Sequence, residues 1–369
     1  MIDVAPSFRA WTAGLVANGE FAALLPGCES ELFDSSCDEG MTVLVADALA
    51  GRQEASEQLR GVFHGATRAM VAHELARQME ARAVIADLAA SGLRTLVLKG
   101  TALAYWLYAQ PAHRVRGDFD LLVEDLAHAG RAGVLLRKLG YAFDGPTVEQ
   151  AAGFETALER TTAGGLVHRI DLHWRLMNNA TLARGFGFDE LWDASVAIPK
   201  LHAEARGLGP VHALAHALLH RITNMPLGRQ DRLIWLYDVH LLVAGFDSDQ
   251  WHAFVRLCRG KAIATPCLDG LQASRAVFAT VVPAEIEATL QSLSAEENWR
   301  LGEMSDLGTL DRAHLGALLW REKPGWLWRK LFPSPAFMRY RYGVTSIAGL
   351  FPAYLRRWWV GVRRGVGFE

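Results

Sequence analysis

The sequence predicts an α+β fold in which a small mixed β-sheet is covered by helices. Short apolar runs of strand length lie between residues 95 and 174, and segments with helical spacing of apolar residues flank them on both sides. Turns that contain glycine or proline separate the two kinds of segment. The chain has 369 residues, of which 51% are hydrophobic and 21% are charged, which is typical of a globular protein with two or three domains.

Helices are expected to fill the region before the sheet. Apolar residues recur at helical spacing in 8–25, 42–49, 57–64 and 68–90, and the last of these segments ends at Ser91-Gly92. The acidic segment 28–40 is expected to be a solvated loop. Residues 1–68 are therefore assigned to an N-terminal helical region, and residues 69–200 to the core.

The core begins with a buried strand at 95–98, and the turn Lys99-Gly100-Thr101 leads from it into a helix at 102–108. A basic loop with His113, Arg114 and Arg116 follows. It ends at Gly117, where a second strand begins.

Two aspartates stand at the start of this second strand. Asp118 and Asp120 are two residues apart and therefore project to one side of the strand, while Phe119 faces the other. Adjacent carboxylates repel each other unless a cation or a shared proton compensates them, and Mg²⁺ is the usual cation beside a phosphate. The alternative is structural, with Asp118 capping a turn and Asp120 facing solvent.

A helix at 126–139 and a short strand at 141–143 come next, followed by a hairpin of strands 155–160 and 166–174 that turns at 163–165. On the second hairpin strand, Val167, Arg169, Asp171 and His173 share one face, which indicates a site. His173 is either a partner of a catalytic group or a substrate contact. Alternatively, Asp171 is an exposed strand residue paired with Arg169 or Arg175.

The remaining chain is expected to be helical, with 201–320 as a helical domain. His212, His216 and His220 form one stripe of the helix 211–221, a spacing that could bind zinc. Packing against the core is the preferred interpretation, with His216 and His220 facing the cleft. A helix at 231–243 carries Asp238 in an apolar frame, and an edge segment is expected at 197–199.

The tail, residues 321–369, differs in composition. It holds ten basic and two acidic residues, with five tryptophans in or beside it. Such a segment suits docking onto the acidic body of the same protein, which is the preferred interpretation, a membrane surface, or an anionic polymer.

The formal net charge of −2 argues against a nucleic-acid partner, which normally requires a strongly basic face. The four cysteines show no Cys-x-x-Cys pairing, and the first residues do not resemble a signal peptide. No run of 18 apolar residues occurs. A cytoplasmic protein, in contact at most with a membrane surface, is expected.

The order of strand, glycine turn, helix, basic loop and Asp-x-Asp strand resembles the nucleotidyltransferase superfamily that includes DNA polymerase beta and the kanamycin nucleotidyltransferases. It is most similar to a bacterial group described as nucleotidyltransferase family proteins. The motifs are Leu98-Lys99-Gly100, the strand motif 114–123 and the helix end 135–141. The similarity is good over roughly 70–240 and loose in the flanks.

The resemblance implies a polymerase beta-like core and transfer of a nucleoside monophosphate from an NTP, such as ATP, to a small-molecule, sugar or peptide acceptor. It makes Asp118, Asp120 and Asp171 the catalytic carboxylates that hold Mg²⁺ or Mn²⁺. The implied triphosphate-binding residues are Lys99, Gly100, Thr101, Arg114, Arg116 and Gly117.

One departure from the superfamily pattern leaves the acceptor and the base open. The superfamily has Gly-Ser or Gly-Gly-Ser where this chain has Lys99-Gly100-Thr101. Two alternatives stand beside the enzyme. One is a non-catalytic binding or assembly protein that keeps the fold and docks through its tail. The other is a nucleotidylating toxin or antitoxin element, which the length of the chain disfavours.

Overall fold

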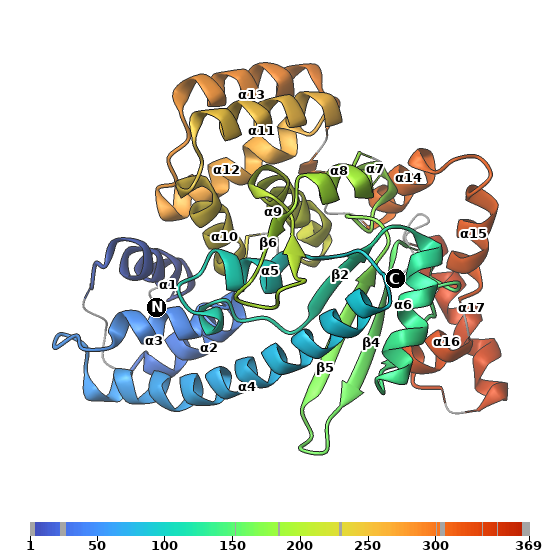
Figure 1. Cartoon of the computed structure of the whole chain (residues 1–369), viewed down its shortest axis with the longest axis horizontal. Coiled ribbons are helices and arrows are strands. Elements are labelled where there is room, and N and C mark those ends of the chain that lie inside the picture. The colour runs from blue at the N-terminus through green and yellow to red at the C-terminus, as the bar shows by residue number, and fades with distance from the viewer. Residues whose placement is uncertain are drawn as a thin grey trace.

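The computed structural model has the predicted α+β architecture, with one sheet in its centre and helices around it (Figure 1). It describes residues 4–22, 27–151, 153–183, 185–228, 231–299, 301–302, 307–333, 335–344 and 346–363. Of the tail charges counted above, Arg364 and Glu369 lie outside these ranges.

Across the described residues the sheet has seven strands in the order β3-β4-β5-β2-β1-β7-β6. The strands are β1 (Thr95–Val97), β2 (Phe119–Val123), β3 (Ala142–Phe143), β4 (Glu155–Thr161), β5 (Val167–His173), β6 (Val196–Ala197) and β7 (Arg206–Gly207). The pairs β2–β5 and β1–β7 are parallel and the others are antiparallel. The predicted strands β1 to β5 are confirmed. The predicted edge segment corresponds to β6, and β7 was not predicted.

Side-chain alternation separates the two faces of the sheet. On β2, Phe119 and Leu121 join a core with Ile170 and Leu172 of β5 beneath helices α4 (Glu57–Ala90) and α6 (Leu126–Lys138). The opposite face turns toward α9 (Pro210–Asn224), and Leu122 belongs to that second core. Asp118, Asp120 and Asp171 follow the same alternation and lie on the α9 side.

Two predictions for the N-terminal region were wrong. The acidic segment is a helix, α2 (Glu29–Glu39), because Leu32 and Ser36 are buried and Gly40 ends the helix in a left-handed conformation. The segments 57–64 and 68–90 form one 34-residue helix, α4, whose N-terminus is capped by the Ser56 hydroxyl. The predicted boundary at 68/69 falls inside this helix. Before α4 stand α1 (Val4–Ala13), a π-helical turn (Gly14–Asn18) and α3 (Thr42–Leu49).

The helices that follow the strands in the sequence form a bundle on the side of the sheet that faces α9 (Figure 1). The remaining elements between residues 99 and 296 are α5 (Lys99–Trp106), α7 (Ala180–Ala183), α8 (Phe188–Asp193), α10 (Leu233–Ala244), α11 (Ser248–Lys261), α12 (Ala264–Phe278) and α13 (Ala284–Glu296), with 3-10 turns at Pro111–His113 and Met225–Leu227. The described residues include no helix that is both long and apolar enough to cross a membrane.

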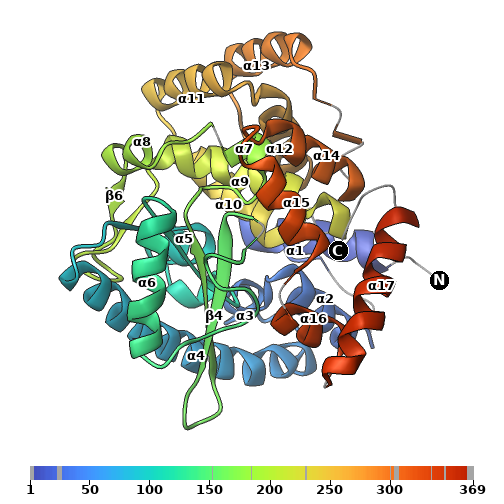
Figure 2. The same cartoon turned by 90° about the vertical axis from the view of Figure 1, so that its right-hand side faces the viewer.

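Helix α14 (Leu307–Ala317) precedes the tail, and the tail folds into α15 (Lys323–Leu331), α16 (Pro335–Tyr342) and α17 (Ile347–Arg363). These helices lie along one side of the molecule (Figure 1) and face the viewer in Figure 2. Trp326 of α15 stacks on His314 of α14 with ring centroids 5.2 Å apart, and the His314 Nδ1 accepts a hydrogen bond from the Ala180 amide. The inner side of the tail is thereby joined to α7.

Candidate functional site

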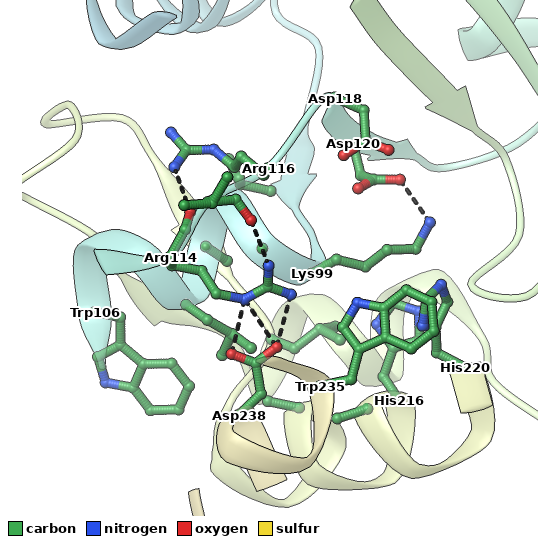
Figure 3. A pocket seen from close by; sticks show the side chains of 18 of the residues that line it. Lys99, Trp106, Arg114, Arg116, Asp118, Asp120, His216, His220, Trp235 and Asp238 are labelled. Atoms are coloured by element: carbon green, nitrogen blue, oxygen red, sulfur yellow. Dashed lines mark hydrogen bonds and ion pairs between the residues drawn. The ribbon is translucent and has the colours of Figure 1, made fainter. Parts of the chain in front are cut away.

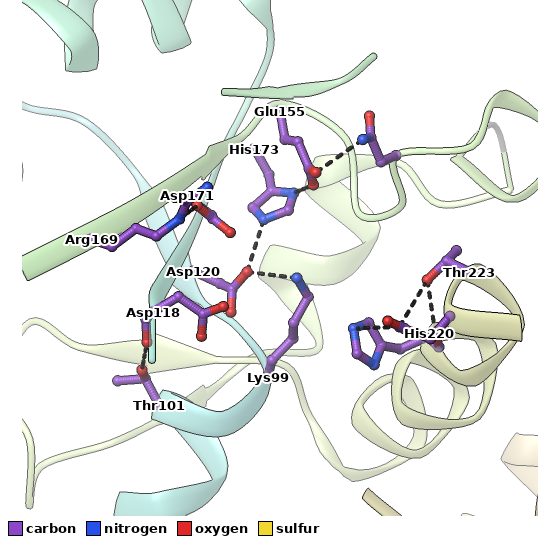
Figure 4. Close-up of polar contacts among 12 residues, drawn as sticks. Lys99, Thr101, Asp118, Asp120, Glu155, Arg169, Asp171, His173, His220 and Thr223 are labelled. Atoms are coloured by element: carbon purple, nitrogen blue, oxygen red, sulfur yellow. Dashed lines mark hydrogen bonds and ion pairs between the residues drawn. The ribbon is translucent and has the colours of Figure 1, made fainter. Parts of the chain in front are cut away.

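The parallel pairing of β2 with β5 brings the predicted carboxylates together. Asp120 lies directly opposite Asp171 in the register of the two strands, and in-register neighbours point to the same face. Asp118, one residue before β2, turns to that face as well (Figure 4). Asp120 is buried, whereas Asp118 and Asp171 are half-buried. The three side chains therefore form one acidic cluster.

The cluster is rich in negative charge that the protein compensates unevenly. Burial and the neighbouring Asp120 raise the pKa of Asp118. Burial, together with Asp120 and Asp118, raises the pKa of Asp171 to about 6, even though Arg169 Nε lies 3.1 Å from Asp171 Oδ1. Asp171 therefore forms the ion pair with Arg169 that was considered as an alternative, and it also belongs to the acidic cluster.

Asp120 is the aspartate of the cluster whose negative charge is stabilised by neighbouring side chains. Lys99 Nζ lies 2.6 Å and His173 Nε2 lies 3.0 Å from its Oδ1 atom. Burial alone would raise the pKa of Asp120, but the Lys99 cation and the His173 hydrogen bond outweigh it and hold that pKa well below its usual range. His173 Nδ1 lies 3.1 Å from Glu155 Oε2 without the geometry of a hydrogen bond, so the imidazole stands between carboxylates from the two strands that flank β5.

The turn at Lys99 is strained in a way that serves this contact. Lys99 has a φ of 47°, a left-handed conformation that costs a residue with a side chain on the order of 1 kcal/mol. Glycine would relieve that strain but would remove the ammonium group beside Asp120. The Thr101 hydroxyl donates to the Asp118 carbonyl over 3.4 Å, and this bond ties the start of α5 to the residue that precedes β2. Gly117 stands exposed just before it.

Arg114 is held by a buried carboxylate. Its Nη2 and Nε atoms donate to the Asp238 carboxylate over 2.7 and 2.8 Å (Figure 3). The Tyr108 hydroxyl also donates to Asp238, over 2.7 Å. A Cβ atom on Gly100 would stand 3.3 Å from the Arg114 guanidinium, so the glycine admits that group beneath the turn. In this arrangement Arg114 supports the Lys99 turn, and contact with phosphate stays a prediction.

Arg116 is anchored in the same manner to the long helix. Its Nη2 atom lies 2.7 Å from Glu74 Oε1 of α4, which also accepts the Tyr105 hydroxyl. Arg77 donates to the Arg116 carbonyl. The loop that leads to Asp118 is therefore fixed from α4, and phosphate binding by Arg116 also stays a prediction.

A cavity of about 260 Å³ opens beside the acidic cluster, between α5 and the helices α9 and α10 (Figure 3). Lys99, Asp118 and Asp120 form one wall. The other lining side chains include Trp106 of α5, and the side formed by α9, α10 and the residues beside them contributes His216, His220, Asn224, Arg232 and Trp235. The cavity can therefore hold a ligand whose charged end meets the acidic cluster and whose other end lies against rings, neutral polar groups and the Arg232 cation.

The two histidines that were expected to face the cleft both line this cavity. Burial, followed by the Lys99 charge, lowers the pKa of His216 well below its usual range and that of His220 to about 3, so both are neutral. Within the described part of the chain, Nε2 of buried His216 has no hydrogen-bond partner. His212 instead lies 3.3 Å from Glu190, near the N-terminal end of α9. The stripe is thus divided between two surroundings, which does not support a shared zinc ion.

Several residues of the site carried no functional prediction. Glu74 and Glu155 hold Arg116 and His173, and Trp106, Asn224 and Trp235 line the cavity. A sequence signal for such a role is absent at Glu74, because Arg77 and Gln78 follow it one helical turn later and a charged residue in such a segment is usually exposed. The cavity tryptophans carry no such signal, because aromatic residues are common in cores.

The donor set fits a hard divalent cation together with a substrate. The described residues contain no group of three potential ligands close enough to enclose a metal ion. Mg²⁺ does not require such a cage, since one or two carboxylates, water and phosphate oxygens satisfy it. Lys99 and His173 both contact Oδ1 of Asp120, so Asp118 and Oδ2 of Asp120 are the oxygens that can take a cation.

The raised pKa of Asp171 predicts that Asp171→Asn stabilises the metal-free protein. A carboxyl whose folded-state pKa lies near 6 rather than 3.8 costs stability as pH rises between these values, and the cost is fully present above them. A pKa difference of about two units between the folded and unfolded states corresponds to a loss of at most about 3 kcal/mol of unfolding free energy. Denaturant unfolding with a chelator at about pH 7.5 should show the variant more stable, and the gain should shrink near about pH 4.5. A variant less stable at both pH values would contradict this.

Comparison with protein families gives one match, an uncharacterised nucleotidyltransferase family, over residues 36–279. The matched segment runs from within α2 to the residue after α12 and includes every residue of the acidic cluster and the cavity described above. Comparison with curated proteins gives no match. Since the family match covers well over half of the chain and contains the whole site, the protein belongs to this nucleotidyltransferase family.

Proposed function

We propose that the protein transfers a nucleoside monophosphate from an NTP to a small-molecule, sugar or peptide acceptor with the help of Mg²⁺, on a polymerase beta-like core. One observation carries the proposal. Asp120 and Asp171 are paired in register on parallel strands with Asp118 on the same face, and Asp118, Asp120 and Lys99 line one cavity. The family match supports nucleotidyl transfer in general.

In this proposal each residue has a distinct task. Asp118 and Asp120 hold the cation, which when bound supplies positive charge to the phosphate oxygens. Asp171 accepts the proton of the acceptor hydroxyl, and its pKa of about 6 suits a base that is mostly ionised near neutral pH. The acceptor oxygen forms a bond to the α-phosphorus, the bond from that phosphorus to the bridging oxygen breaks, and pyrophosphate leaves. Lys99, which stays protonated, and His173 hold Asp120 in place.

The part of the cavity lined by α9 favours a flat or polyhydroxylated group. His216 and His220 are neutral there, and Trp235 presents an edge contact to His220 with centroids 4.8 Å apart. The Asn224 amide lies 3.2 Å from His220 Nε2. The net charge of −2 disfavours a long nucleic acid as the acceptor.

The test uses the full chain with each of ATP, GTP, CTP and UTP, labelled at the α-phosphate, and the small-molecule fraction of a cell extract as acceptor pool. Pyrophosphate release that requires Mg²⁺, with the label moving into a new product, is the expected result. Absence of release with all nucleotides would contradict the proposal. If calorimetry then still showed NTP binding, the non-catalytic binding alternative would replace it.

A further inference from the structure

The outer side of the tail exposes a row of apolar side chains. In α17, Ile347, Phe351, Leu355 and Trp359 are 79%, 70%, 45% and 61% exposed. Residues four apart lie on one side of a helix. The row extends over twelve helical steps, from residue 347 to residue 359, and is therefore about 18 Å long. Figure 2 shows α17 along one edge of the molecule.

Ring contacts extend this row onto α15. Trp328 and Phe332 have ring centroids 4.4 Å apart, and Phe332 and Trp358 have centroids 5.3 Å apart. We call the combined patch the aromatic surface; it consists of Trp328, Phe332, Ile347, Phe351, Leu355 and Trp359. A patch of this kind on an otherwise ordinary surface usually marks an interaction site.

The opposite side of α17 already has partners, since Ala353 and Arg357 are buried there and Arg357 donates to the Lys330 carbonyl. Trp358, on the flank of the row, donates its indole N–H to the Leu331 carbonyl over 2.7 Å. The inner side thus holds α17 on α15. The aromatic surface is on the side that this packing leaves exposed.

Positive charge surrounds the aromatic surface. Between 321 and 363, the sequence has nine basic residues and one acidic residue, Glu322. Arg356 is exposed and follows Leu355 by one position, which places it about 100° around the helix from that residue, at the border of the row. Arg321, Arg339 and Arg341 are exposed as well. An apolar row with a basic border is typical of helices that lie in a membrane interface.

We propose that the aromatic surface docks flat onto an anionic lipid bilayer. The apolar row would enter the boundary between headgroups and acyl chains, the tryptophans would sit at headgroup level, and the arginines would meet the lipid phosphates. A second copy of the chain fits less well, because a two-fold contact through this patch would bring its like-charged borders together. This docking is independent of the proposed catalytic function.

Vesicle sedimentation of the full chain tests the proposal. Binding to vesicles of phosphatidylcholine with phosphatidylglycerol, but not to phosphatidylcholine alone, is expected, and salt should weaken it. The variant Phe351→Ser/Leu355→Ser/Trp359→Ser should lose roughly tenfold or more of the affinity. The matched control is Leu75→Ser/Met79→Ser on α4, where the side chains are 58% and 72% exposed, and it should bind like the wild type.

A second variant keeps the test independent of folding. Arg339→Glu/Arg356→Glu changes only exposed charges and should lower binding to anionic vesicles while circular dichroism stays unchanged. The proposal is overturned if the wild type sediments with neither vesicle, or if the serine variant binds as well as the α4 control. It is also overturned if light scattering shows a wild-type dimer that the serine variant separates, because the occupant would then be a second copy.

Discussion

Asp118→Asn should lower the rate of pyrophosphate release by about a thousandfold, since removing a carboxylate that holds the cation forfeits several kcal/mol of charge stabilisation. Asp118 carries a raised pKa from burial and from Asp120, so its neutral replacement should not destabilise the fold. A loss of activity would therefore show that the catalytic step is impaired and not the folding of the protein. A stopped assay at saturating NTP measures the rate of that step.

Asp249→Asn is the matched control for this variant. Asp249 is exposed in the first turn of α11 and is absent from the cavity wall, so the same chemical change should leave the rate unaltered. A second readout is the melting temperature. Mg²⁺ with NTP should raise it in the wild type and in the control, and less in Asp118→Asn. Equal rates for Asp118→Asn and the wild type would remove the acidic cluster from the proposed mechanism.

Arg114→Met should cost about 3–5 kcal/mol of unfolding free energy, the largest stability effect expected here, because it leaves Asp238 buried without its cation. The two side chains are 7% and 5% exposed, and Tyr108 adds a hydrogen bond to the same carboxylate. The guanidinium also lies against Gly100, so the Lys99 turn should loosen and NTP binding should weaken. Urea unfolding and calorimetry measure the two effects.

A surface ion pair provides the comparison. Arg275 and Glu287 lie 2.8 Å apart with side chains 40% and 19% exposed, and Arg275→Met should cost about 1 kcal/mol or less. The double variant Arg114→Met/Asp238→Leu should recover part of the stability, because it removes the uncompensated charge. An Arg114→Met variant as stable as Arg275→Met would show that the buried pair does not hold this part of the fold.

Local patterns in the sequence predicted those parts of the site that depend on backbone periodicity. The two-residue repeat places Asp118 and Asp120 on one face with Phe119 on the other, and the same repeat on β5 turns Asp171 and His173 together. The hairpin turn of β4 and β5 was expected from its glycines, and Gly165 adopts a φ of 80° there. Such features require only neighbouring residues, so they can be inferred without a structure.

The features that were missed depend on contacts between distant segments. Arg114 and Asp238 are separated by 124 positions, and Glu74 and Arg116 by 42. No local pattern specifies such pairs, so the anchoring of both arginines could not be predicted, while their contact with phosphate stays a prediction. The helical state of α2 was missed for a similar reason, since its acidic sequence is stabilised by burial of Leu32 against other helices.

The unbroken helix α4 fixes the spacing between the core of the N-terminal helices and the core under the sheet. Leu59 and Phe63 belong to the core of the N-terminal helices, Glu74 holds Arg116, and Val84 and Leu88 lie under the sheet. Inserting one residue between Phe63 and Glu74 would rotate everything beyond it by about 100°. Leu59 and Phe63 could then not keep their apolar contacts while Glu74 still pointed toward Arg116. Changes in the length of α4 should therefore be tolerated only in steps near whole helical turns.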